Sequence, residues 1–170
     1  MTSHYRSNRK AGFAVLSIAV SLTAFAATTT AQELKPTLVP ATEIPWPDSA
    51  ARTEGTSMRS GLQTLVIAGD SKANALYTMM FKLPAETKVP PHSHPDVRSC
   101  FVLSGTWYFA YGDVRDEAAL KALPAGSHYT EPAGMNHFAE TRAEPVVAEC
   151  TAVGPTATTF ANPADDPRRR

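Results

Sequence analysis

Short apolar or alternating stretches, bounded by glycine, proline or aspartate, follow one another from residue 62 to residue 152. A period of two is typical of half-buried strands, because successive strand side chains point to opposite faces of a sheet. The stretches that predict strands are Leu62–Ala68, Ala75–Leu83, Thr87–His94, Arg98–Leu103, Thr106–Tyr111, Ser127–Glu131, His137–Thr141 and Val146–Ala152. Many short strands separated by turns predict an all-β sandwich or barrel. One helical turn is expected within residues 116–123, where Glu117 and Lys121 are spaced i,i+4.

The first 31 residues have a different pattern. Three basic residues among the first ten precede an apolar run over residues 11–27, and small residues follow. Such a segment is typical of a secretory signal peptide, so residues 1–31 are predicted to be removed and the mature protein to be periplasmic or secreted. Cleavage is expected after Ala31, with Ala26 as the other candidate. The alternative is an uncleaved membrane anchor, for which the run is short.

The segment that follows the leader is rich in proline, threonine, serine and alanine. Prolines break helices, so residues 32–60 are predicted to form an extended N-terminal arm, with Trp46 as its anchor. The strand-rich residues 61–155 are predicted to form one barrel, and residues 156–170 a C-terminal tail. A chain of 170 residues agrees with a single domain.

The charge balance argues against nucleic acid as a partner. The chain has 16 basic and 16 acidic side chains, and the leader contains three basic residues and no acid, which leaves 13 against 16, or −3. A mildly acidic protein has no basic face for nucleic acid and no polybasic membrane patch. The chain also lacks a phosphate-binding loop or a nucleotide-binding glycine motif.

Two cysteines, Cys100 and Cys150, leave two interpretations open. Export to an oxidising compartment favours a disulfide, which would contribute about 4 kcal/mol in the loop-entropy model. Alternatively, both are small apolar core residues, because each lies in an apolar, strand-like context.

Histidines supply the clearest chemical signal. His92 and His94 stand at i and i+2 in Pro91-His92-Ser93-His94-Pro95, and His137 follows on a later strand. Side chains at i and i+2 of an extended segment point to the same side. Three neutral imidazoles are ligands that first-row transition metals accept, and they leave coordination positions open for water or substrate. The spacing therefore predicts a metal site at His92, His94 and His137.

These residues resemble the two motifs of the cupins. The run from Pro84 to Gly105 resembles the first motif, and residues 126–137 match the second: glycine, five residues, proline, one residue, glycine, two residues, histidine. About 20 residues separate the motifs, and the resemblance covers roughly residues 60–155. It implies a jelly-roll barrel of six to eight strands with a proline-rich arm. It also implies a metal held by the three histidines and by an acidic residue four or five positions after the second histidine.

The acidic position departs from the resemblance, because Arg98 occupies it. A guanidinium does not ligate metals, and a unit charge about 6 Å from a divalent ion costs roughly 6 kcal/mol at an effective dielectric near 20. Two interpretations therefore stand: a metal site of reduced affinity, or vestigial histidines. Arg98 is a candidate to bind a substrate carboxylate, and the alternative is an ion pair with Asp96 or Glu131. The acids that could replace the missing ligand are Glu131, Glu140 and Glu149.

Other candidates carry less weight. His128 is expected at the rim or in solvent. Trp107, Tyr108, Phe109 and Tyr111 alternate on one strand and are more often core than substrate platform.

The functional hypotheses belong to three classes. The first is a metal-dependent enzyme on a small anionic organic molecule, with dioxygenation before isomerisation. The second is a non-catalytic barrel that binds a small ligand or a metal. The third is an interaction protein with a vestigial pocket. The metal would be Fe, Mn, Zn, Ni or Cu, and a homodimer is expected from the resemblance and the arm.

Overall fold

The structure, a computed structural model, describes residues 36–48 and 55–169. The chain divides after residue 31 into two units, and all described residues belong to the second. The predicted signal peptide and its cleavage positions lie outside the described residues and stay predictions. None of the helices described is long and apolar enough to cross a membrane.

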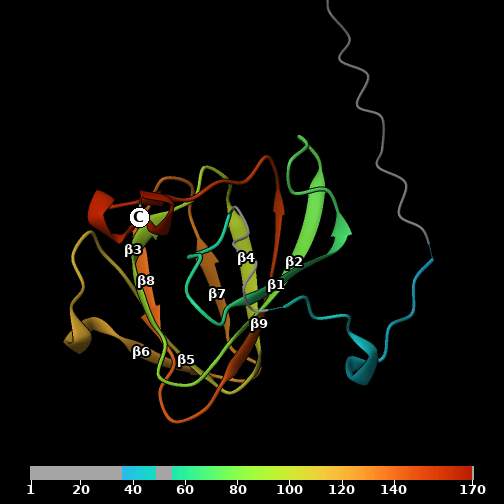
Figure 1. The fold of residues 1–170 in the computed structure, drawn as a ribbon, viewed down its shortest axis with the longest axis horizontal. Coiled ribbons are helices and arrows are strands. Elements are labelled where there is room, and N and C mark those ends of the chain that lie inside the picture. Colours follow the sequence, from blue (N-terminus) through green and yellow to red (C-terminus); the bar gives the residue numbers. More distant parts are fainter. Residues whose placement is uncertain (1–35, 49–54, 170) are drawn as a thin grey trace, which may run out of the picture. The chain divides into compact units, whose positions relative to one another are not determined.

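Two five-stranded antiparallel sheets face each other (Figure 1). The first sheet contains, in spatial order, β1 (Gln63–Gly69), β2 (Leu76–Leu83), β9 (Val146–Val153), β4 (Arg98–Ser104) and β7 (His128–Glu131). The second contains β10 (Thr159–Phe160), β3 (Lys88–Ser93), β8 (His137–Glu140), β5 (Thr106–Tyr111) and β6 (Lys121–Pro124). Four 3-10 turns complete the described elements: η1 (Ala41–Glu43), η2 (Glu117–Ala119), η3 (Pro163–Asp165) and η4 (Pro167–Arg169). The prediction of an all-β jelly-roll barrel is confirmed.

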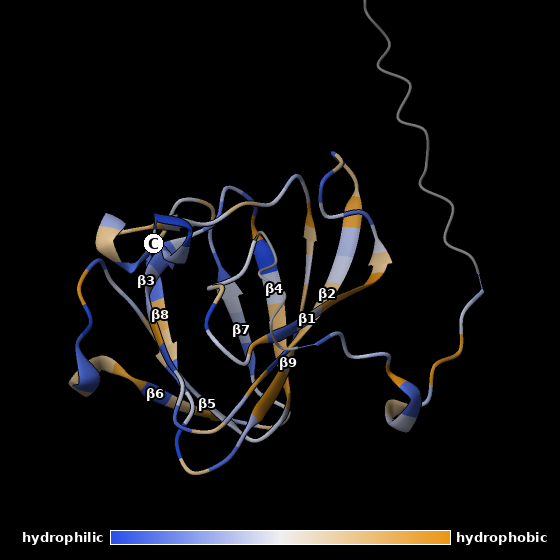
Figure 2. Ribbon diagram, viewed as in Figure 1, coloured by the Kyte–Doolittle hydropathy of each residue, from blue (hydrophilic) through white to orange (hydrophobic). Residues whose placement is uncertain are grey.

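The period-two pattern puts one face of each strand into the core. Along β4, Arg98, Cys100 and Val102 are buried and the residues between them are exposed. Figure 2 shows that the strands of both sheets contain hydrophobic as well as hydrophilic residues. The main core cluster joins both sheets; its buried members are Leu62, Leu83, Val89, Cys100, Val102, Trp107, Phe109, Tyr129, Ala139, Val146 and Cys150.

A glycine makes the tight connection between β4 and β5 possible. Gly105 has a φ of +73°, and a Cβ at this position would lie 2.3 Å from the carbonyl oxygen of Pro145. Only glycine fits such a conformation and such an approach. This glycine closes the stretch that resembles the first cupin motif.

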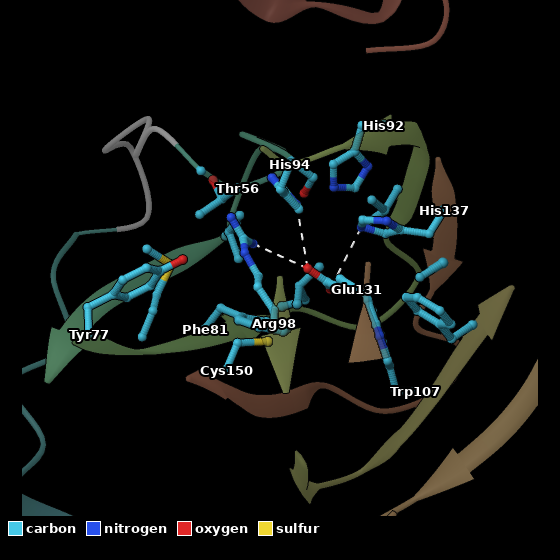
Figure 3. A pocket seen from close by; sticks show the side chains of 18 residues that line it. Thr56, Tyr77, Phe81, His92, His94, Arg98, Trp107, Glu131, His137 and Cys150 are labelled. Atoms are coloured by element: carbon cyan, nitrogen blue, oxygen red, sulfur yellow. Dashed lines mark hydrogen bonds and ion pairs between the residues drawn. The ribbon is translucent and has the colours of Figure 1, made fainter. Parts of the chain in front are cut away.

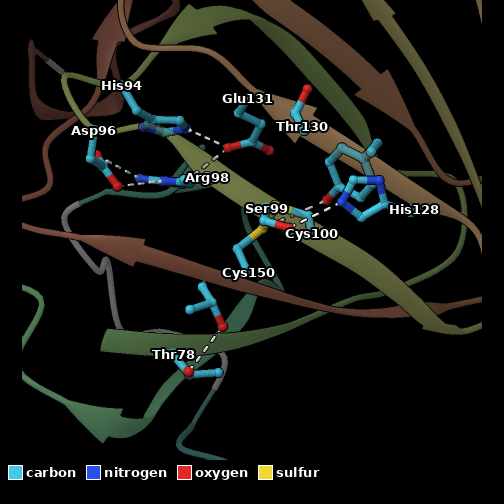
Figure 4. Close-up of a disulfide and its surroundings, with 12 residues drawn as sticks. Thr78, His94, Asp96, Arg98, Ser99, Cys100, His128, Thr130, Glu131 and Cys150 are labelled. Carbon is cyan, nitrogen blue, oxygen red and sulfur yellow. Dashed lines mark hydrogen bonds and ion pairs between the residues drawn. A yellow bond between two sulfur atoms is a disulfide. The ribbon is translucent and has the colours of Figure 1, made fainter. Parts of the chain in front are cut away.

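A disulfide between Cys100 and Cys150 ties β4 to β9 (Figure 4). The two residues are directly opposite each other in the strand register, and both are buried. Opposite positions of an antiparallel pair bring Cβ atoms close enough for a bridge. Of the two interpretations that the sequence left open, the structure contains the disulfide.

Two segments differ from the expected pattern. Within residues 116–123, the helical part is only the short turn η2, and β6 follows it as the partner of β5. A strand forms because the free edge of β5 offers backbone hydrogen bonds that a single isolated helical turn does not. Strand β10 lies within residues 156–170 and pairs with β3.

The described part of the arm is mostly exposed and contains η1. Trp46 is half-buried, and the Gln63 side chain donates a hydrogen bond of 2.7 Å to the carbonyl oxygen of Pro47. Residues 55–58, at the end of the predicted arm, are buried.

Candidate metal centre

The second sheet brings three imidazoles together at one end of its strands. His92 on β3 is directly opposite His137 on β8, and His94 follows the end of β3. All three are buried, and one nitrogen of each lies within 4.8 Å of the others. Figure 3 shows the three rings gathered on one side of a cavity. The structure thus places the three predicted ligands around a common point.

Backbone carbonyls fix the orientation of each ring. The Nδ1 atoms lie 2.8 Å from the oxygen of Pro90 for His92, 2.7 Å from that of Ala157 for His94, and 3.2 Å from that of Met135 for His137. A carbonyl oxygen only accepts, so each Nδ1 carries the proton and donates. In a neutral ring, each Nε2 then keeps its lone pair. Metal-binding histidines are typically held in this way.

The environment keeps these rings neutral. Burial lowers the pKa of His92 to about 3, with a further contribution from His137. Burial also lowers the pKa of His137 to about 4. For His94, burial and the neighbouring Arg98 guanidinium lower the pKa even further. The neutral imidazole is the form that binds a metal.

Arg98 faces the same cavity from the first sheet, but two carboxylates engage it. Its Nε donates to Asp96 Oδ2 at 3.0 Å, its Nη1 to Glu131 Oε2 at 3.3 Å, and its Nη2 to Thr156 Oγ1 at 2.5 Å. Of the two roles considered for Arg98, the structure shows the ion pair, and it is formed with both Asp96 and Glu131. The role of Arg98 in binding a substrate carboxylate stays a prediction.

Asp96 is the centre of this network. It accepts hydrogen bonds from the Tyr77 hydroxyl at 2.5 Å and from the Thr156 hydroxyl at 2.7 Å. Burial would raise the pKa of Asp96, but the bonds and the charge of Arg98 outweigh burial and lower it. Burial raises the pKa of Tyr77 to about 12. The aspartate is thus a charged, fully engaged partner of the guanidinium.

Glu131 is the acid that lies beside the imidazoles. It pairs with Arg98 in the register of β4 and β7, and its carboxylate oxygens lie 3.6 Å from His94 Nε2 and 3.7 Å from His137 Nε2. Burial raises its pKa, although the charge of Arg98 opposes this shift. Of the other two candidates, Glu140 binds Arg115 and Arg142, and Glu149 lies on β9 between core-facing residues.

A small cavity of about 40 Å³ opens beside these groups. A buried water needs roughly 10–15 Å³ of such space, so the cavity has room for about three waters. Its apolar lining includes Leu62, Tyr77, Met79, Phe81, Leu83, Val89, Trp107, Phe109 and Ala139. Trp107 and Phe109 are thus both core and cavity wall. The arm contributes Gly55, Thr56 and Ser57, which the sequence gave no signal to find.

His128 lies apart from the centre. It is exposed on β7, and its Nε2 is 3.0 Å from the Ser99 hydroxyl (Figure 4). Its ring packs against the exposed Phe101. This position agrees with the expected place at the rim or in solvent.

Comparison with known proteins supports the fold. Residues 35–157 match the family described as the ChrR cupin-like domain. Similar solved structures include the polyketide cyclase RemF from Streptomyces resistomycificus (TM-score 0.56, 17% identity, 76% of this chain and 89% of that one). The DMSP lyase DddQ from Ruegeria pomeroyi DSS-3 is also similar (TM-score 0.53, 19% identity, 81% and 84%). At these identities the likeness shows the fold alone. No protein with a curated description matches the sequence.

Proposed function

Because this chain belongs to the ChrR cupin-like family, within the cupin superfamily, we propose that it is a metal-dependent enzyme acting on a small organic molecule. His92, His94 and His137 would hold a divalent transition metal. One observation carries this proposal: three buried, neutral imidazoles converge, and a backbone carbonyl fixes each Nδ1.

The donor set suits Fe, Mn, Zn, Ni or Cu. When bound, such an ion supplies Lewis acidity or oxygen activation. The chain's own residues hold the imidazoles in place, and the apolar walls around Trp107 and Phe109 restrict water to a small volume. We propose dioxygenation of a small anionic molecule as the first reaction to test and isomerisation as the second.

Arg98 could bind a substrate carboxylate only if one of its present hydrogen bonds is replaced. Its Nη1 is bound to Glu131, so a substrate carboxylate would have to replace that bond. The Asp96 and Thr156 bonds would still hold the rest of the guanidinium.

The small cavity favours a second candidate function. Space for about three waters accommodates a metal with its own waters more easily than a metal with a larger organic molecule. The alternative is therefore a non-catalytic barrel that binds a metal or a very small ligand.

We further propose a periplasmic or secreted location and a homodimer. The buried disulfide supports an oxidising compartment. Gel filtration with light scattering on the purified protein tests the dimer.

The test of the function starts with metal content. The protein is purified without chelators, and bound metals are measured for the wild type, for His92→Ala and for His128→Ala as a control with an exposed histidine. We expect about one metal per chain in the wild type and in the control. We expect less than a tenth of that in His92→Ala, because the substitution removes one of the few protein ligands that hold the metal.

Oxygen uptake then separates the two functions. The metal-loaded wild type is incubated with a panel of small carboxylic acids, and oxygen consumption and product isomers are followed. Turnover that disappears in His92→Ala supports the enzyme. Stoichiometric metal without turnover supports the binding barrel, and a wild type that binds no metal contradicts both.

A further inference from the structure

We propose that Glu131 is the acidic ligand of the metal centre and that Arg98 is a positioning residue that holds its carboxylate. This inference rests on the proposed function, because it concerns the same three histidines. The acidic ligand would then come from β7, because Glu131 lies directly opposite Arg98 of β4 in the strand register.

The distances agree with a shared ion. With bonds of about 2.1 Å, two donors of a tetrahedral centre lie about 3.4 Å apart. Glu131 Oε2 lies 3.6 Å from His94 Nε2, and Glu131 Oε1 lies 3.7 Å from His137 Nε2, so each oxygen faces one imidazole. Both pairs are thus within a few tenths of an ångström of ligand spacing.

The chemistry of these atoms also calls for a cation. Because Nδ1 of each ring donates to a carbonyl, Nε2 of the neutral ring presents a lone pair, and an ionised carboxylate only accepts. Lone pairs of Glu131, His94 and His137 therefore face one another inside the barrel (Figure 3). Because each of these two imidazoles faces a different oxygen, a metal ion held by both carboxylate oxygens is a partner for these lone pairs.

The local charge favours a cation as well. Arg98 contributes one positive charge, whereas Asp96 and Glu131 contribute two negative charges. The cluster thus has a formal charge of −1. The guanidinium of Arg98 would repel a metal ion, and the two carboxylates would attract it. At equal distances the attraction is as strong as the repulsion, so the carboxylates offset the effect of Arg98.

The guanidinium is fixed well enough to aim the carboxylate. Asp96 accepts from Nε and Thr156 from Nη2. Nη1 is left directed at Glu131 Oε2, and Figure 4 shows Arg98 between Asp96 and Glu131. A planar guanidinium presents its donors in a rigid fork. Partners that orient a metal ligand typically change metal affinity 10–100-fold when they are removed, which is about the effect we expect for Arg98.

The first experiment measures Zn²⁺ affinity by competition with a chelator, for the wild type, Glu131→Gln and the control Glu149→Gln. We expect Glu131→Gln to weaken binding by about 100-fold or more, a larger effect than for an orienting partner, and Glu149→Gln to match the wild type. The absorption spectrum of the Co²⁺-loaded protein should change for Glu131→Gln only, because a ligand is lost. Unchanged affinity and spectrum in Glu131→Gln would overturn the inference.

A charge exchange provides the second test. Glu131→Arg alone places two guanidinium groups at the site and should abolish Zn²⁺ binding. Adding Arg98→Glu returns one acid and one arginine to the pair of strands β4 and β7. We expect the double variant to bind Zn²⁺ at least tenfold more tightly than Glu131→Arg alone. No recovery in a double variant whose circular dichroism matches the wild type would contradict the proposal; if the double variant does not fold, Glu131→Gln decides.

Arg98→Lys tests the positioning role. It keeps the charge and removes the fork, so we expect about tenfold weaker Zn²⁺ binding with the Co²⁺ spectrum of the wild type. A wild-type affinity would overturn this role. A wild type that binds no metal defeats the proposed function itself, whereas metal binding that is equal in wild type and Glu131→Gln defeats only this inference.

Discussion

Arg98 owes its place inside the barrel to the two acids around it. Its side chain is only 5% exposed, and that of Asp96 only 1%. An arginine in a low-dielectric interior is tolerated when paired charges and hydrogen bonds compensate for its lost hydration. Asp96, Glu131 and Thr156 provide that compensation.

Asp96→Asn should therefore be strongly destabilising. It removes one of the two charges that compensate Arg98, and breaking a buried ion pair costs about 3–5 kcal/mol. Urea unfolding of the two proteins measures the difference. The control is Glu117→Gln, which weakens the ion pairs of the exposed Glu117 with Lys88 and Arg115 and should leave the midpoint nearly unchanged. Equal midpoints for Asp96→Asn and the wild type would show that the network does not stabilise the fold.

The sequence predicted His92 and His94 from their local i,i+2 spacing, and His137 from the resemblance of residues 126–137 to the second cupin motif. It proposed Glu131 only as one of three acids, since its neighbours depend on the register of β4 and β7. The bonds of Asp96 to Tyr77 and Thr156 were not predictable: they join residues 19 and 60 positions apart. Contacts of that separation are set by the packing of sheets, not by a local pattern.

At the level of secondary structure, the strands were largely predictable, because the alternation of inward- and outward-facing residues is a local pattern. Each of the eight predicted stretches overlaps one strand of the structure. Two strands were missed: β6 lies where the i,i+4 spacing of Glu117 and Lys121 predicted a helical turn, and β10 is only two residues long, which is too short to show an alternation. The buried residues 55–58 were assigned to the extended arm, because the stretch 32–60 is rich in proline, threonine, serine and alanine and predicts no strand of the barrel.

The link between β4 and β9 leads to a prediction at the level of elements. The disulfide joins cysteines 50 residues apart, and closing such a loop removes unfolded-state entropy worth about 4 kcal/mol. Cys100→Ala combined with Cys150→Ala should lower the free energy of unfolding by about this amount in urea. The wild type treated with a reductant in denaturant serves as a comparison. A double variant as stable as the oxidised wild type would contradict the expected contribution.

For the whole molecule, the neutral histidines make stability depend on pH. In the metal-free folded protein, burial lowers the pKa of His92 to about 3 and that of His137 to about 4, whereas in the unfolded chain they titrate near about 6.5. The unfolded chain therefore binds more protons between these values. Stability should fall as the pH decreases from about 6.5 to about 4, by up to about 1.4 kcal/mol per pH unit for each histidine.

Urea unfolding of metal-free protein at several pH values measures this dependence. Glu131, whose pKa burial raises, opposes it, so the net slope is smaller than the sum over the histidines. His92→Gln should show a shallower dependence than the wild type. Stability that stays constant or rises as the pH falls through this window would mean that the histidines are not buried as neutral groups.

The most direct measurement of the central claim is a crystal structure of the metal-loaded protein with diffraction recorded at the absorption edge of the metal. We expect one anomalous peak per chain, about 2.1 Å from the Nε2 atoms of His92, His94 and His137. Absence of a peak between these three rings, or a peak only at the exposed His128, would contradict it.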